Sequence, residues 1–544
     1  MTLQLLFFGS IPNSDSIRTA KFLMLIINST IVRVNLVIPQ PAIGDRMDVQ
    51  TEIVSQEKQF RKHVALAAGS LMLTLAMWAL ASPLGATPDE WLHLGSIYCA
   101  NGVDGELCHK ISSENVLTAS ADIDQSSCLT TNTADLSLCD DPKTGSYLMA
   151  SSSYPKGYYR VMNVFTPLFG STSVIAMRLF NGLLAAVFLI FQVLLIDKKK
   201  RIAWLTSFTF TLVPMSIFLI SSVHPHAWGI IGCAHGWMFL ITAFGERKTN
   251  RLKQVAGWVM WTFCGLMCLF SRYDVFLMFL ATTLITAIFT NLRSDVVRIK
   301  TVIYAALLTL VGSVAVVFLV PPSSTLSWLP FHPSIGQYTN QVWITAWVVR
   351  FISIPVEILG SGGIGHNAII VPQIVSIIGI MIIGMTIAFA LIKTTVSQIA
   401  TGLISIAILF YCILLLNNLM YRDLENLNGR YVIVFIPFMV GIFVFLSKSP
   451  VQMMEIRTLR FFAIALLTIA HSISLHSVLG HFVDSQSGSL LPIRVGETGW
   501  WWVGFPLGPN FVWALGSIAF LKFLTAIWSI VPTVQISIAE VVKS

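Results

Sequence analysis

Long apolar runs with almost no charge constrain this chain more than any other feature. Only 11% of its 544 residues are charged, and 55% are hydrophobic. A soluble globular chain carries about 25% charged residues. Runs of roughly 18 or more apolar residues recur, and each can cross a hydrocarbon core of about 30 Å. The pattern predicts an all-α, polytopic membrane protein, a bundle of about twelve transmembrane helices.

The expected spans can be placed along the sequence to within about four residues at each end. They are 64–81, 177–196, 202–220, 228–244, 255–270, 275–290, 301–320, 374–392, 399–416, 431–446, 461–475 and 511–530.

Charge in the loops between these spans predicts the orientation. Alternate loops are short and basic, and the positive-inside rule places them in the cytoplasm. The opposite loops are longer and hold most of the acids, including loops 82–176 and 321–372, which we expect on the extracytoplasmic side of the cytoplasmic membrane. The net charge of +8 is spread over short clusters, which indicates no nucleic-acid surface.

Three regions follow from this pattern. Residues 1–63 are expected to be an N-terminal cytoplasmic tail. Its first part is either disordered or present because the start codon is assigned upstream of Met47, and an interfacial helix is the alternative. Residues 64–446 form the expected transmembrane core, and residues 447–544 add C-terminal transmembrane helices.

Four of the eight cysteines lie in the first long loop, at Cys99, Cys108, Cys128 and Cys139. Cysteines in an exported loop indicate disulfides, here two. Cys99–Cys108 with Cys128–Cys139 is the simplest pairing, but all three connectivities stay open, as do unpaired thiols.

An acidic pair follows the first span in the sequence Pro88-Asp89-Glu90, with His93 three residues further on. One interpretation is structural, because acids after a proline commonly begin a helix and stabilise its N-terminus. The other is catalytic. A short helix would place an acid and His93 on one face, where they could act as a general base or hold a metal.

Two further groups lie at expected outside turns. His224 and His226 flank Pro225 and could bind substrate or a metal, although no zinc-binding motif accompanies them. Arg272 and Asp274 lie between two spans. Arg272 could form a local ion pair with Asp274 or bind a lipid phosphate, and Asp274 could contact substrate or a metal.

Arg430 and Tyr431 begin the tenth expected span. An arginine there can extend to the headgroups, or it can bind a phosphate through its planar fork. Arg160 and Arg272 are expected on the same outer side, as are Arg350 and Arg422. Carboxylates and guanidinium groups on one face suit a reaction in which an acid activates a hydroxyl and arginines hold an anionic leaving group.

Four stretches together resemble the bacterial membrane family called domain of unknown function 2142, which is similar to the GT-C glycosyltransferases. These are Pro88-Asp89-Glu90 with His93; Tyr158-Tyr159 with Pro167-Leu168-Phe169-Gly170 and Arg178-Leu179-Phe180-Asn181; Ser221-Ser222-Val223-His224-Pro225; and Gly429-Arg430-Tyr431 with Ile436-Pro437.

The resemblance implies a GT-C-like fold and sugar transfer from a polyprenyl-phosphate donor outside the cytoplasmic membrane. It assigns the acid role to Asp89 or Glu90 and the phosphate role to Arg430, less directly to Arg272. The chain also departs from the family pattern. His224-Pro225-His226 replaces an Asn-Pro-Asp turn, and residues 362–367 replace a Gly-Trp-Leu-Asp-like turn. These departures leave a specialised or inactive member open.

The sequence therefore predicts an inverting membrane glycosyltransferase that modifies a cell-envelope glycan, glycolipid or protein. It identifies no cofactor and leaves a divalent metal open. The main rival is a transporter or flippase of lipid-linked glycans, but the charges lie at span ends and no repeat is visible, which favours the enzyme. A non-catalytic assembly scaffold is the third interpretation, because position 226 lacks the acid.

Overall fold

The structure is a computed structural model. It describes residues 46–101, 109–110, 117–118, 154–168, 170–197, 200–245, 250–293, 299–319, 353, 356–360, 363–364, 369–393, 395–420, 429–449, 451–484 and 508–532. The chain divides into two units, Met1–Gln59 and Phe60–Ser544, and the bundle and site described below belong to the second.

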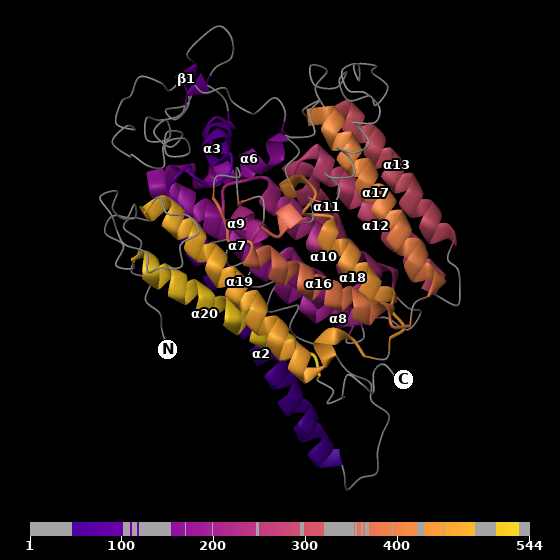
Figure 1. Ribbon diagram of the computed structural model, residues 1–544. Helices are drawn as coiled ribbons and strands as arrows, with labels where there is room; N and C mark the ends of the chain where they lie inside the picture. The colour runs from indigo at the N-terminus through magenta and orange to yellow at the C-terminus, as the bar shows by residue number, and fades with distance from the viewer. Residues whose placement is uncertain are drawn as a thin grey trace. The chain divides into compact units, whose positions relative to one another are not determined.

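The described part of the chain is helical apart from one short pair of strands (Figure 1). Strands β1 (His109–Lys110) and β2 (Leu117–Thr118) pair antiparallel, with His109 opposite Thr118. The α-helices are α2 (Arg46–Leu80), α3 (Glu90–Tyr98), α6 (Lys156–Met162), α7 (Gly170–Leu195), α8 (Arg201–Thr211), α9 (Pro214–Ile220), α10 (His226–Phe244), α11 (Arg251–Ser271), α12 (Tyr273–Arg293), α13 (Ile299–Leu319), α16 (Ile374–Leu391), α17 (Val396–Met420), α18 (Ile436–Leu446), α19 (Arg457–Asp484) and α20 (Pro509–Trp528). The short 3₁₀ helices are η5 (Asn163–Leu168), η9 (Gly429–Tyr431) and η10 (Met453–Glu455).

Eight helices in the described residues are long and apolar enough to cross a membrane, or nine if the bent pair α8 and α9 counts as one span. Three shorter apolar helices, Val302–Val316, Val396–Ile408 and Pro437–Leu446, fall where three more spans are expected. The structure thus supports a membrane protein with several spans, and the count of twelve stays a prediction. Helix α2 begins at Arg46, so part of the segment expected as a tail is helical.

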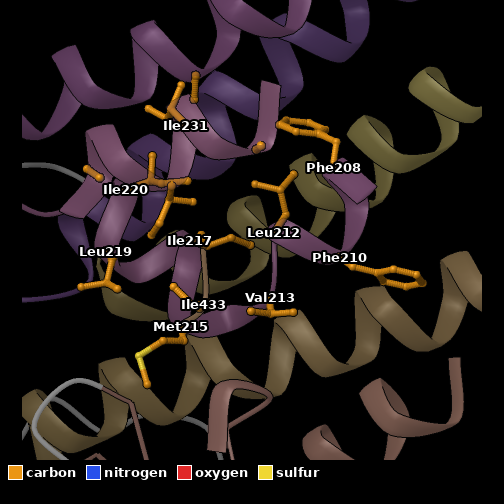
Figure 2. Close-up of a cluster of buried hydrophobic side chains, with 14 of the residues drawn as sticks. Phe208, Phe210, Leu212, Val213, Met215, Ile217, Leu219, Ile220, Ile231 and Ile433 are labelled. Atoms are coloured by element: carbon orange, nitrogen blue, oxygen red, sulfur yellow. The ribbon is translucent and has the colours of Figure 1, made fainter. Parts of the chain in front are cut away.

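The expected span 202–220 is broken in the structure. Helices α8 and α9 meet at an angle of 79°. The cause is local, because Pro214 begins α9 and the residue before it, Val213, is extended (φ −66°, ψ 156°), as a residue before proline prefers to be. Figure 2 shows the buried apolar side chains that surround this break, among them Phe208, Leu212 and Ile433.

Among the eight long apolar helices of the described residues, α10 is the most deeply buried, with 94% of its apolar stretch inside the protein. Glycines let its neighbours come close. A Cβ on Gly232 would lie 2.7 Å from Cys268 Sγ and 2.8 Å from the Cys264 carbonyl oxygen of α11, and one on Gly236 would lie 2.4 Å from a Phe279 ring carbon of α12. Small residues four apart commonly allow such contact between membrane helices.

Gly232→Ala should therefore destabilise the protein by about 1–3 kcal/mol, because the new methyl group forces α10 and α11 apart. Thermal unfolding in detergent measures the effect. Gly384→Ala is the matched control, since a Cβ on Gly384 of α16 meets nothing within 4 Å. An equal change in both variants would show that the close packing at Gly232 is unimportant.

The cysteines separate into two sets. Cys99, which follows α3, is disulfide-bonded, and its expected partners Cys108, Cys128 and Cys139 lie outside the described residues. The two-disulfide framework therefore stays a prediction. Cys233, Cys264 and Cys268 are buried free thiols, and the sulfurs of Cys233 and Cys268 lie 3.8 Å apart between α10 and α11.

Candidate functional site

The candidate residues gather at the end of the bundle where α3 and α6 lie (Figure 1). They come from segments far apart in the sequence. These segments are the start of α3, helix α6, the turn between α9 and α10, the turn between α11 and α12, and η9. The apolar pattern alone would place these segments in separate loops, but they form one polar cluster. We call it the Asp89 cluster, and its residues are Asp89, His93, Tyr154, Tyr159, His224, His226, Arg272, Asp274, Arg430 and Tyr431.

Glu90 is fully buried and forms an ion pair with Arg178 of α7. Arg178 Nε donates to Glu90 Oε1 at 2.9 Å, and Nη2 donates to Oε2 at 2.5 Å. The backbone N–H groups of Gly85 and Val223 also donate to the carboxylate, each at 3.0 Å. Both oxygens of Glu90 therefore have two donors each, an arrangement that joins three segments and leaves little capacity to accept a proton from a substrate.

Arg178 completes this structural network. Its remaining N–H groups donate to the carbonyl oxygens of Ala79, Ser82 and Pro83, at distances from 2.6 to 2.9 Å. In the sequence, Arg178 belongs to a stretch that resembles the family, and no role was predicted for it. A single arginine near the start of an apolar span was the available signal, because a charge buried at membrane depth needs a partner.

Asp89 is arranged differently from its neighbour. Its side chain is 20% exposed, and its Oδ2 lies 3.0 Å from Arg430 Nη1. Its φ of 54° places it in the left-handed region, and among the described residues no other non-glycine residue has a positive φ. Asp and Asn tolerate that region better than most residues do. The turn thus points two adjacent carboxylates to different partners.

Three histidines lie beside Asp89. The rings of His93 and His224 are 4.6 Å apart, and those of His224 and His226 are 5.9 Å apart. His224 Nε2 lies 3.8 Å from Asp89 Oδ2, an ion-pair distance too long for a hydrogen bond. The backbone N–H of His226 donates to His224 Nδ1 at 2.9 Å. Neutral His224 therefore carries its proton on Nε2, toward Asp89.

Burial keeps the histidines of this cluster neutral. It lowers the pKa of His224 to about 3, although the Asp89 carboxylate acts in the opposite direction. Burial, reinforced by His224, also lowers the pKa of His93 well below its usual value. His93 Nδ1 shares a hydrogen bond of 3.0 Å with Tyr159 Oη, and burial raises the pKa of that phenol well above its usual value. The histidines and Tyr159 are thus neutral donors and acceptors at pH 7, beside the two ion pairs of the cluster.

The protein should lose stability as the pH falls from 7 to 5. The folded pKa of His224 lies below the unfolded value of about 6.5, so the unfolded chain binds more protons in this window and acid favours unfolding. The loss amounts to about 2 kcal/mol for one such histidine. Thermal unfolding against pH measures it, and His224→Asn should flatten the curve. An unchanged slope in that variant would contradict the assignment.

Arg272 and Asp274 form the local ion pair, one of the two alternatives left open above. Arg272 Nε and Nη2 donate to the two oxygens of Asp274 at 2.9 and 3.0 Å. The guanidinium also packs against the rings of Tyr154 and Tyr431, with its carbon 5.5 and 4.8 Å from their centroids. Arg272 is therefore held from several sides by protein groups.

Arg430 is less fully held by carboxylates than Arg272. Its Nη2 donates to Tyr431 Oη at 3.2 Å, and its guanidinium carbon lies 5.1 Å from the centre of that ring. Nη1 faces Asp89. Arg160, the third predicted phosphate ligand, is exposed on α6, whereas Arg272 and Arg430 are buried. The structure thus brings two of the three predicted arginines together.

A second network fixes the turn that carries the histidines. Trp228 Nε1 donates to Asn181 Oδ1 at 3.0 Å, and Asn181 Nδ2 donates to the Ser222 carbonyl oxygen at 2.9 Å. The ring of Tyr158 packs on Trp228 at 5.0 Å. Sequence reasoning gave these residues no individual role, because their contacts join α6, α7 and α10 across long separations.

Asp89, His93 and His224 could hold a metal by distance alone, since one ligand atom from each lies within 4.8 Å of the others. Two observations oppose it. His224 Nδ1 already accepts a hydrogen bond, so its Nε2 carries a proton where a metal would bind. Arg430 Nη1 also lies 3.0 Å from the carboxylate. The arrangement suits an anion better than a cation.

A separate cavity lies at the break between α8 and α9. It is mostly apolar and is lined by residues that include Val213, Leu359, Ile378, His471 and Phe520. None of its lining residues belongs to the Asp89 cluster.

A family model described as "Predicted membrane protein (DUF2142)" matches residues 72–442, more than half of the chain. The chain therefore belongs to the DUF2142 family of membrane proteins, which confirms that part of the resemblance; the similarity to GT-C glycosyltransferases stays a prediction. The match includes every residue of the Asp89 cluster. No curated protein and no solved structure matches the chain.

Proposed function

We propose that this chain is an integral-membrane glycosyltransferase that uses a polyprenyl-phosphate sugar as donor. One observation carries the proposal: Asp89 Oδ2 lies 3.0 Å from Arg430 Nη1, within a buried cluster of histidines and tyrosines at one end of a membrane bundle. A carboxylate beside a guanidinium provides a base for an acceptor hydroxyl and a cation for a departing phosphate.

In the proposed reaction, the acceptor oxygen attacks the anomeric carbon of the donor sugar, and the bond between that carbon and the phosphate oxygen breaks. Asp89 takes the hydroxyl proton. The polyprenyl phosphate leaves with the electron pair, and Arg430 stabilises its growing charge. Attack from the face opposite the leaving group inverts the anomeric centre. Glu90 supports this site by fixing α3 against α7, and it takes no part in proton transfer.

The location of the reaction follows from the charge pattern. The positive-inside rule places the segments of the Asp89 cluster on the extracytoplasmic side of the cytoplasmic membrane. Lipid-linked sugars and acceptors of the cell envelope meet there. A cell-envelope glycan, glycolipid or exported protein is the proposed acceptor, and no metal or organic cofactor is assigned a step.

One observation favours a second function. Transporters commonly use broken membrane helices near their substrates, and α8 and α9 form such a break, at 79°, beside an apolar cavity. A transporter or flippase would move a lipid-linked glycan across the membrane without forming a glycosidic bond. We favour glycosyl transfer over transport because the charged and polar residues of the Asp89 cluster lie at one end of the bundle.

Comparative mass spectrometry of envelope glycans from cells with and without this chain tests the proposal. We expect one class of glycan, glycolipid or glycoprotein to lose a sugar residue when the chain is absent, and the lipid-linked donor to accumulate. Unchanged glycan masses, with lipid-linked glycan retained on the inner leaflet, would favour the transporter instead.

A further inference from the structure

We propose that Asp89 and the donor phosphate compete for Arg430, so that the free site is closed by an internal ion pair which the donor opens. This inference rests on the proposed function for the identity of the donor, but its binding test requires no sugar transfer. The ligand class is a phosphate ester carried by a polyprenyl lipid.

The first step of the argument is the position of the ion pair. Arg430 Nη1 and Asp89 Oδ2 are 3.0 Å apart, and their side chains are 10% and 20% exposed. Phosphate binds a guanidinium through two parallel hydrogen bonds at least as well as a carboxylate does. An oxyanion that approaches Nη1 from the side of Asp89 would take the place that this carboxylate occupies.

The second step is a set of buried ring nitrogens. Nε2 of His93, His224 and His226 is buried without a hydrogen-bond partner among the described residues. His224 Nε2 carries a proton, because Nδ1 accepts the His226 N–H, and it is directed at Asp89 Oδ2 from 3.8 Å. A buried donor without a partner costs free energy. A phosphate oxygen that came about 3 Å from Nε2, closer than that carboxylate oxygen, would accept its hydrogen bond.

The third step distinguishes the two buried arginines. Arg272 donates to both oxygens of Asp274 and is packed between two tyrosine rings. An entering phosphate would have to break that paired contact. Arg430 has a single contact of 3.0 Å with its carboxylate, so phosphate would displace one acid oxygen there and not a paired contact.

The competition has a consequence for the order of events. While Asp89 is paired with Arg430, its Oδ2 is directed at the guanidinium. Once phosphate takes the cation, that oxygen can turn to an acceptor hydroxyl. The base thus becomes effective only after the donor is bound. We expect the donor to bind first and the acceptor second.

Binding of polyprenyl phosphate to the purified full-length protein in nanodiscs tests the competition. Asp89→Asn should bind the lipid phosphate more tightly than the unaltered protein, on the order of tenfold, because the competing charge is gone. Arg430→Gln should bind it at least about tenfold more weakly. Asn tolerates the left-handed backbone of position 89, and Asp89→Gly is a second variant that relaxes it.

Two controls distinguish lipid phosphate from inorganic phosphate, and an effect of Asp89 from a general effect of removing an acid. Inorganic phosphate is titrated in a parallel experiment. If Asp89→Asn binds both inorganic phosphate and polyprenyl phosphate more tightly, the phosphate group alone competes with Asp89. If it binds only the lipid more tightly, the polyprenyl chain is also needed for the competition. Asp197→Asn, an acid whose side chain is 50% exposed, should change nothing. Equal or weaker binding of both phosphates by Asp89→Asn and Asp89→Gly would overturn the proposal, whatever the glycan assay shows.

Discussion

Asp89→Asn should reduce transfer by about a hundred- to ten-thousand-fold, the range typical for loss of a general base. Asparagine keeps the shape of the side chain and tolerates the positive φ of 54°, but it cannot accept a proton. The cell-envelope glycan that depends on this chain should disappear from cells that carry only the variant. Mass spectrometry of that glycan gives the result, and membrane insertion is checked by the amount of protein in the membrane fraction.

The control for this variant is Asp197→Asn. Asp197 lies near Lys200 and Lys253, at 3.6 and 4.0 Å, outside the Asp89 cluster, so its loss should leave the glycan unchanged. Retention of normal glycan by Asp89→Asn, at normal protein levels, would show that Asp89 is not the base.

Arg178→Met should destabilise the protein by about 3–5 kcal/mol, the cost of leaving one member of a buried ion pair without the other. The variant removes two hydrogen bonds to Glu90 and three to backbone carbonyl oxygens at the end of α2. Glu90 then keeps only the backbone N–H donors of Gly85 and Val223, and its buried charge has lost its partner. Thermal unfolding in detergent measures the loss, together with the yield of folded protein.

A double-mutant cycle with Glu90→Gln shows whether the two residues act as a pair. Because each single substitution already breaks the ion pair, the double variant should lose less than the sum of the two single losses. Additive losses would mean that Glu90 and Arg178 stabilise the protein independently. The cycle also separates Glu90 from Asp89, since Glu90→Gln should lower stability, and it should lower activity per folded molecule much less than Asp89→Asn does.

The sequence predicted the membrane class and the approximate positions of most spans. Uninterrupted apolar runs carry that information by themselves, because a helix is the simplest structure that satisfies its backbone inside lipid. The break in span 202–220 could also have been predicted from Pro214, which disfavours a helical Val213. The early start of α2 at Arg46 could not, because the polar residues before the span give no periodic signal.

The candidate site was predicted in part. Asp89, His93, His224 and Arg430 were recognised as polar residues at span ends, and the structure brings them together. The different roles of Asp89 and Glu90 were not visible, because they depend on one backbone angle. Arg178 is separated from Glu90 by 88 positions, and periodicity says nothing about contacts at that distance.

Arg460 shows the same limit at a basic loop. It precedes the expected span 461–475, and a cation there favours a cytoplasmic loop. The structure shows its guanidinium donating to carbonyl oxygens of Met454, Trp528 and Val531 at 2.6 to 2.9 Å. Two of these carbonyl groups lie at the C-terminal end of α20, where a cation is favourable. One residue can serve both roles, but only the structure reveals the second.

The central claim is that the Asp89 cluster catalyses formation of a glycosidic bond while the bond between the donor sugar and its lipid phosphate breaks. Purified protein in proteoliposomes, supplied with lipid-linked sugars and acceptors extracted from the native membranes, tests this most directly by mass spectrometry. We predict free polyprenyl phosphate and one new glycoside in equal amounts, and neither with Asp89→Asn. Movement of intact lipid-linked sugar between leaflets, with no phosphate released, would contradict the account.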